Sequence, residues 1–170
     1  MAKIKILYYS IGGYVPVGLL CAVIALFADQ VSKYFVALNI ETGSPVVYGD
    51  YFNMIKVWNT GVSFSMFNNY GLTGTIVLCV VSFVVCGFLL YWLYHETDKI
   101  KQIALGFIIG GAIGNVIDRI RFGAVLDFLD FHYQAHHWPA FNLADSFICV
   151  GAFILILLEI KNEKKKGIKE

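Results

Sequence analysis

The stretch that decides the fold class lies at residues 70–94 and reads YGLTGTIVLCVVSFVVCGFLLYWLY. It carries no charge, and it exceeds the roughly 20 apolar residues with which an α-helix crosses the ~30 Å hydrocarbon core of a bilayer. The whole chain points to the same solvent, because 58% of its 170 residues are hydrophobic and only 15% are charged. Soluble domains average about 45–50% apolar residues and ~25% charged residues. Residues 70–94 therefore predict a transmembrane helix.

Three more apolar segments predict further spans, at about 13–35, 102–121 and 141–160. We expect an all-α membrane protein in which residues 1–170 form one integral membrane domain. The first apolar run continues past signal-peptide length, so we interpret it as a retained span. The four cysteines lie inside apolar runs without C-x2-C spacing and are interpreted as small core residues: Cys21, Cys79, Cys86 and Cys149.

The cations beside the spans predict the orientation. Most of the 13 Lys and Arg residues flank one side, namely Lys3, Lys5, Lys99, Lys101, Lys161, Lys164, Lys165, Lys166 and Lys169. That side, with both termini, is expected to be cytoplasmic. The longer connections, 36–69 and 120–140, are then extracytoplasmic, and the first mixes aromatic and β-branched residues with turn formers. It predicts a small β-rich segment on the membrane surface.

Two further patterns concern packing and partners. Gly106, Gly110 and Gly114 recur every four residues, which predicts close approach of a neighbouring helix backbone. The net charge is +1 and the cations form no stripe, so we expect no nucleic-acid partner. Membrane phospholipid is the expected surrounding.

Five acids map to the extracytoplasmic side: Asp29, Asp118, Asp127, Asp130 and Asp145. Charges near hydrocarbon usually face a cavity or a partner. Several of these acids also have a structural explanation. Asp29 and Lys33 have the i, i+4 spacing of an ion pair. Asp118 and Arg119 are adjacent and need partners elsewhere in a polar network, and Asp145 stands where an acid would complete a capping box with Asn142. Asp130 is unassigned.

Asp127 favours chemistry over structure. It lies in the apolar segment Gly-Ala-Val-Leu-Asp-Phe, residues 123–128, which could return to the interface and bring a second carboxylate to Asp145. Two adjacent carboxyls share a proton, so one can deprotonate an attacking water while the other protonates the leaving group. Such a pair hydrolyses a peptide bond without a metal or a cofactor.

Other chemistries are open but less well supported. His132 and His136 could bind zinc if their segment were helical, although no H-E-x-x-H pattern accompanies them, and the role of His137 is unassigned. Ser63 and Ser146 lack an identifiable base. An ion-coupled transporter could use the aspartates as a relay, but residues 51–95 contain no acid to carry it across. A purely structural scaffold is the third alternative.

Five motifs in order resemble the bacterial lipoprotein signal peptidases, or signal peptidase II: Asp29–Lys33, Asn59–Phe64, Gly110–Arg119, Gly123–Phe128 and Phe141–Asp145. The resemblance covers most of the chain. It implies a membrane aspartic endopeptidase that removes the signal peptide from diacylglyceryl-modified prolipoproteins, immediately before the lipidated cysteine, with its site near the extracytoplasmic face of the cytoplasmic membrane. Asp127 and Asp145 match the catalytic pair. The positions that would bind substrate or organise the site are Asn59, Gly61, Asn115, Arg119, Asn142 and Ala144, while Asp29, Lys33 and Asp118 would form a structural network.

Overall fold

Four long helices and a small sheet make up the described part of the chain. The computed structural model describes residues 15–61 and 71–167. Its helices are α2 (Val15–Asn39), α3 (Gly71–His95), α4 (Lys99–Phe122) and α5 (Leu143–Gly167). Its strands are β1 (Val46–Val47), β2 (Phe52–Asn59), β3 (Val125–Tyr133) and β4 (His136–His137). All four helices are long and apolar enough to cross a membrane, which confirms the predicted helical membrane fold.

The helices run further than the apolar segments that predicted them. α2 continues to Asn39, four residues past the expected end, and α5 continues to Gly167 through the lysine-rich stretch. α4 begins at Lys99 because the Asp98 carboxylate caps it, accepting hydrogen bonds from the backbone N–H groups of Ile100 (2.7 Å) and Lys101 (3.3 Å). Polar residues thus extend helices beyond their apolar length, where hydropathy gives no signal.

α4 is the central helix and packs on α2, α3 and α5. A Cβ atom added at Gly106 would collide with the Gly18 carbonyl, and one at Gly110 would collide with the Ala22 carbonyl. The spacing of these glycines therefore serves the close backbone approach that the sequence predicts. By contrast, most side chains of α3 and α5 lie outside the packed core, as expected for helices surrounded by lipid.

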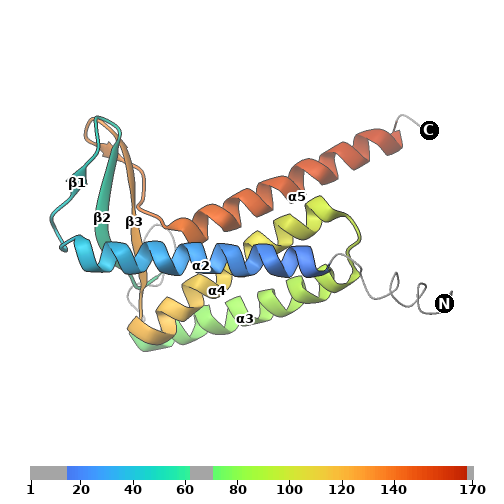
Figure 1. Ribbon diagram of the computed structural model, residues 1–170, viewed down its shortest axis with the longest axis horizontal. Helices are drawn as coiled ribbons and strands as arrows, with labels where there is room; N and C mark the ends of the chain where they lie inside the picture. Colours follow the sequence, from blue (N-terminus) through green and yellow to red (C-terminus); the bar gives the residue numbers. More distant parts are fainter. Residues whose placement is uncertain (1–14, 62–70, 168–170) are drawn as a thin grey trace.

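The sheet covers one end of the bundle (Figure 1). Its strand order is β1-β2-β3-β4 with antiparallel pairs, and the register between β2 and β3 shifts between Met54 and Val57. The predicted β segment of the first connection is confirmed by β1 and β2. The second connection also forms strands, and the part of the apolar segment that contains Asp127 lies in β3. Leu126 and Phe128 of β3 pack with Val36 of α2 and with Ile40, the residue that follows α2.

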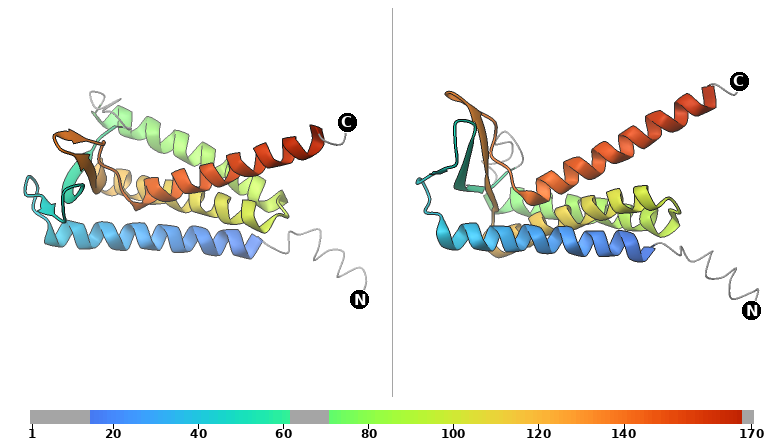
Figure 2. Two further views of the ribbon diagram at one scale, coloured as in Figure 1. Left: turned by 90° about the horizontal axis from the view of Figure 1, so that it is seen from above. Right: turned by 45° about the horizontal axis from the view of Figure 1, so that its top comes forward.

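The first residues of α2 and the last of α5 lie at the end opposite the sheet, and α5 diverges from the other helices in that direction (Figures 1 and 2). The beginning of α5 lies beside β3, since Phe141 forms a β-bridge with Leu129. The part of α5 nearest the sheet is therefore fixed in relation to β3.

Candidate active site

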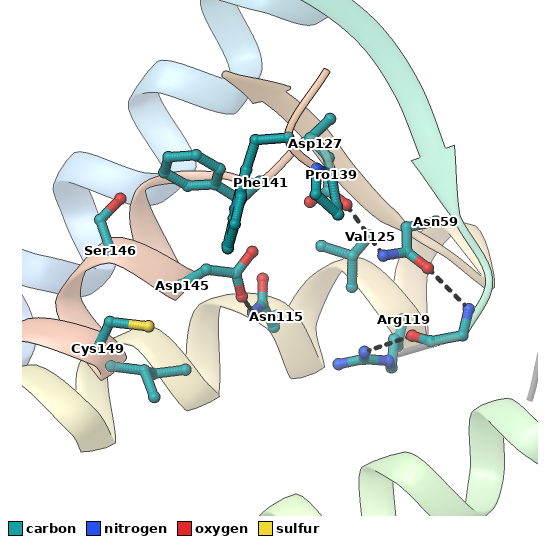
Figure 3. A pocket seen from close by; sticks show the side chains of 14 residues that line it. Asn59, Asn115, Arg119, Val125, Asp127, Pro139, Phe141, Asp145, Ser146 and Cys149 are labelled. Atoms are coloured by element: carbon teal, nitrogen blue, oxygen red, sulfur yellow. Dashed lines mark hydrogen bonds between the residues drawn. The ribbon is translucent and has the colours of Figure 1, made fainter. Parts of the chain in front are cut away.

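A pocket of about 500 Å³ lies between the sheet, α4 and the first turns of α5. Six of the residues that the sequence singled out line it: Asn59, Gly61, Asn115, Arg119, Asp127 and Asp145. Figure 3 shows the two aspartates arriving from different elements, Asp127 from β3 and Asp145 from α5. The aspartates are 18 positions apart in the chain, yet the fold brings both carboxylates to one cavity.

The start of α5 fixes Asp145. The Asn142 Oδ1 atom accepts a hydrogen bond from the Asp145 backbone N–H (3.0 Å), and Asp145 Oδ2 accepts one from the Asn142 backbone N–H (3.3 Å). These are the two bonds of a capping box, so Asp145 has the helix-capping role that the sequence offered as its structural explanation. Its other oxygen, Oδ1, accepts from Asn115 Nδ2 at 2.8 Å. One carboxylate therefore both closes the helix start and lines the pocket.

Asp127 is buried, with 3% of its surface exposed. Its Oδ1 accepts a hydrogen bond from Asn142 Nδ2 (2.7 Å) and its Oδ2 accepts one from Asn59 Nδ2 (3.0 Å). Burial raises the pKa of Asp127 to about 6, opposed by the bond from Asn59, while the nearby charge of Asp145 raises it further. The proton of Asp127 is thus exchangeable close to neutral pH.

Arg119, which the family resemblance assigns to substrate binding or site organisation, lines the pocket. Its Nη2 donates to the Gly61 carbonyl (3.1 Å), and the Gly61 backbone N–H donates to Asn59 Oδ1 (3.0 Å). Among the described residues, its buried Nε has no hydrogen-bond partner. Arg119 as a whole lines the pocket, and guanidinium N–H groups are donors that suit a carbonyl or phosphate oxygen.

A buried charge cluster lies behind the pocket. Lys33 Nζ stands 2.9 Å from both Asp29 Oδ2 and Asp118 Oδ2, and it donates to Asn115 Oδ1 at 3.0 Å. The remaining Asp29 oxygen accepts from the Ala144 backbone N–H (2.9 Å). Asn115 connects this cluster to the pocket, since its side-chain oxygen accepts from Lys33 and its side-chain nitrogen donates to Asp145. The three residues expected to form a structural network are therefore in direct contact.

Gln30 is a member of this cluster that sequence reasoning missed. Its Nε2 lies within hydrogen-bond distance of Asp29 Oδ2 (3.2 Å), the Gly114 carbonyl (3.3 Å) and Asp118 Oδ1 (3.1 Å). A polar amide beside Asp29 within an apolar run is the signal that could have revealed it. Gln30 supplements the single cation that faces two carboxylates.

The histidine segment is not helical. β3 and β4 form a hairpin that turns at Gln134 with φ 54°, and the rings of His132 and His137 stack at 4.9 Å between centroids. The zinc hypothesis needed His132 and His136 on one helical face, so its geometric premise is wrong. His137 Nδ1 instead contacts Asp130 Oδ1 at 2.8 Å.

The remaining polar and sulfur predictions have mixed outcomes. Ser63 lies outside the described residues, and Ser146 donates to the Asn142 carbonyl (3.0 Å) at the pocket wall. Cys79 and Cys86 are buried as expected, and Cys21 is partly exposed. The interpretation of Cys149 as a core residue is wrong, because it is exposed and lines the pocket. Apolar sequence context does not separate a core position from one on the pocket wall.

The family model and the curated relatives that match this chain name one family, and a solved structure shares its fold. The family model described as "Signal peptidase (SPase) II" matches residues 21–161. The lipoprotein signal peptidase of Aeromonas hydrophila is 43% identical over 150 residues, covering 86% of this chain and 90% of the relative. That of Pseudoalteromonas atlantica is 40% identical over 144 residues, covering 84% and 88%. A solved bacterial membrane enzyme matches with a TM-score of 0.80 and 27% identity, over 88% of this chain and 90% of that one.

Proposed function

Because the chain belongs to the signal peptidase II family of aspartic proteases, we propose that Asp127 and Asp145 act on a water molecule as its catalytic pair. In this proposal residues 1–170 form one peptidase domain. It removes the signal peptide from a diacylglyceryl-modified prolipoprotein immediately before the lipidated cysteine. The observation that carries the proposal is the convergence of these two carboxylates on one pocket. Asparagine amides donate to both oxygens of Asp127 and to one oxygen of Asp145.

The chemistry follows from two carboxyl groups that share a proton. The ionised group takes a proton from water as the water oxygen attacks the scissile carbonyl carbon, and the protonated group donates to the developing oxyanion. As the C–N bond breaks, the first group gives the proton it took from water to the leaving amine. The second group takes a hydroxyl proton from the tetrahedral diol, which returns both carboxyls to their starting state. The pKa of Asp127, raised by burial to about 6, suits either side of this exchange near neutral pH.

The neighbouring polar groups position the participants. Asn142 and Asn115 hold the carboxylates, and the guanidinium of Arg119, which lines the pocket, donates to a carbonyl oxygen of the substrate. Asn59 and Gly61 connect that guanidinium to Asp127. Fixed donors and acceptors lower the barrier by removing the need to reorient during the reaction.

The surroundings of the pocket fit a lipid-anchored substrate. Apolar residues form much of its wall, including Trp138, Phe141 and Ile148. A substrate held in the bilayer by a signal helix and acyl chains reaches such a site by lateral diffusion. With the lysine-rich helix ends in the cytoplasm, the pocket lies near the extracytoplasmic face of the cytoplasmic membrane.

The test compares conservative substitutions in purified protein supplied with a diacylglyceryl-modified precursor and an unmodified control peptide. Asp127→Asn and Asp145→Asn keep side-chain shape but remove the titrating group, and we expect each to lower cleavage at least ~10³-fold. Asp50→Asn is the matched control, since Asp50 is exposed and lies outside the pocket. Cleavage by either pocket variant at the parental rate would refute the pair.

A further inference from the structure

Asp130 connects three strands through one carboxylate. Asn53 of β2 donates from Nδ2 to Asp130 Oδ2 (3.0 Å), and His137 of β4 contacts Oδ1 at 2.8 Å and Oδ2 at 3.0 Å. Burial alone would raise the pKa of this acid, but the bonds from His137 and Asn53 outweigh it and hold the pKa below its usual range. Asp130 is 4% exposed, whereas the side chain of its partner His137 is half exposed.

β4 has little else to fix it. It is two residues long, both exposed, and among the residues that the structure describes its strand partner is the end of β3. Hairpin ends of this size are marginal in water. Two side-chain contacts of His137 therefore tie β4 to β3: its ring stacks on that of His132, and its Nδ1 contacts the buried carboxylate of Asp130.

The segment that follows β4 forms a wall of the acid pocket. Trp138, Pro139 and Ala140, which we call the strap, line both that pocket and a second cavity of about 540 Å³ that contains Asp130 and His137. Backbone hydrogen bonds to β3 hold the strap at its ends, from Trp138 N to the Phe131 carbonyl (2.8 Å) and from Phe141 N to the Leu129 carbonyl (3.2 Å). Pro139 itself has no N–H to donate.

We propose that Asp130 and His137 are positioning residues for the peptidase reaction, forming a latch that fixes the strap and thereby sets the wall of the substrate pocket. This rests on the proposed function, because it assigns the strap to substrate binding. Neither latch residue lines the acid pocket. Loosening the strap leaves the two acids in place and weakens the binding of the substrate and of its transition state equally. Such a change raises KM and leaves kcat unchanged.

The chain provides a matched control within the same two-residue strand. His136 is exposed, lines neither pocket and is adjacent to His137. We would compare Asp130→Asn, His137→Gln, their double variant and His136→Gln with a lipid-modified precursor. We expect each latch variant to raise KM about tenfold with kcat within about twofold, since the lost bond involves a charged group. The double variant should match the singles, because all three lack the same contact.

A second measurement reports on the strap without substrate. In a background carrying Trp58→Phe and Trp92→Phe, Trp138 is the remaining tryptophan, and acrylamide quenching of its fluorescence measures its exposure. We expect quenching to rise in the latch variants and to stay at the parental level in His136→Gln. If Asp130→Asn does not fold, His137→Gln carries the test, because its side chain is half exposed, at 51%.

Three results would overturn the latch: parental KM and quenching in both single variants, a loss confined to kcat, or a double variant whose effect equals the sum of the singles. These outcomes are separable from failure of the proposed function. Asp127→Asn tests the reaction whatever the latch does, and the quenching tests the latch whatever the reaction is.

Discussion

Replacing Lys33 by Met should strongly destabilise the bundle. This lysine is 4% exposed and stands 2.9 Å from one oxygen of Asp29 and 2.9 Å from one of Asp118, which are 0% and 2% exposed. Methionine has a similar length and no charge, so the substitution creates little cavity. Its main effect is to leave two buried carboxylates facing each other without a cation.

The expected magnitude follows from that geometry. Breaking a buried ion pair by removing one partner costs about 3–5 kcal/mol, because the remaining charge stays desolvated. Here one cation serves two anions, which places Lys33→Met at the upper end of that range. Asp118→Asn in the same protein removes one of the anions and should recover about half of the loss. A loss of this size is a large fraction of the ~5–15 kcal/mol that stabilises an ordinary protein.

Unfolding in mixed micelles, titrated with dodecyl sulfate and followed by far-UV circular dichroism, measures this free energy. Lys101→Met is the matched control, since that lysine is 4.0 Å from its partners Glu96 and Glu159 and more exposed, and such pairs contribute at most ~1 kcal/mol. If Lys33→Met unfolded within about 1 kcal/mol of the parent, the charge cluster would not hold the bundle together and our reasoning would be refuted.

Two further predictions concern pH and packing. The folded protein holds the proton of Asp127 with a pKa of about 6, against 3.8 for the free group, so the resulting stability is full below about pH 4 and is lost as pH rises through 6. Asp127→Asn should remove this fall of ~3 kcal/mol, and equal pH slopes in unfolding titrations of parent and variant would contradict it. Gly110→Ala should lower the unfolding free energy by about 1–3 kcal/mol, because a Cβ there meets the Ala22 carbonyl. Gly87→Ala meets nothing within 4 Å, and an equal loss in this control would argue against the packing explanation.

The helices were predictable because lipid imposes a strong and local requirement on composition. Residues 70–94 nearly coincide with α3, and the i, i+4 spacing of Asp29 and Lys33 brings them together on α2. The capping-box pattern of Asn142 and Asp145 likewise depends on neighbours in sequence. Each of these features depends on residues within a few turns of one another.

The sheet shows where sequence reasoning stops. Residues 125–133 are an apolar run with two acids, and pairing with β2 and β4 makes them a strand. The contact of Asp130 with Asn53 joins residues 77 positions apart, which no spacing rule predicts. The pairing of β3 with β4 places His132 and His137 side by side and removes the helical face that a zinc site on His132 and His136 required.

Asn142 has a mechanical consequence for α5. Its amide binds Asp127 while its carbonyl oxygen caps the helix, so the first turn of α5 is pinned to β3. The helix has 25 residues, about 37 Å at 1.5 Å per residue, and diverges from the bundle towards its far end. A change in tilt of about 5° would therefore move that far end by about 3 Å and Asp145 by less than ~0.5 Å. A bilayer that tilts α5 about this end would therefore change the spacing of the two aspartates by less than ~0.5 Å.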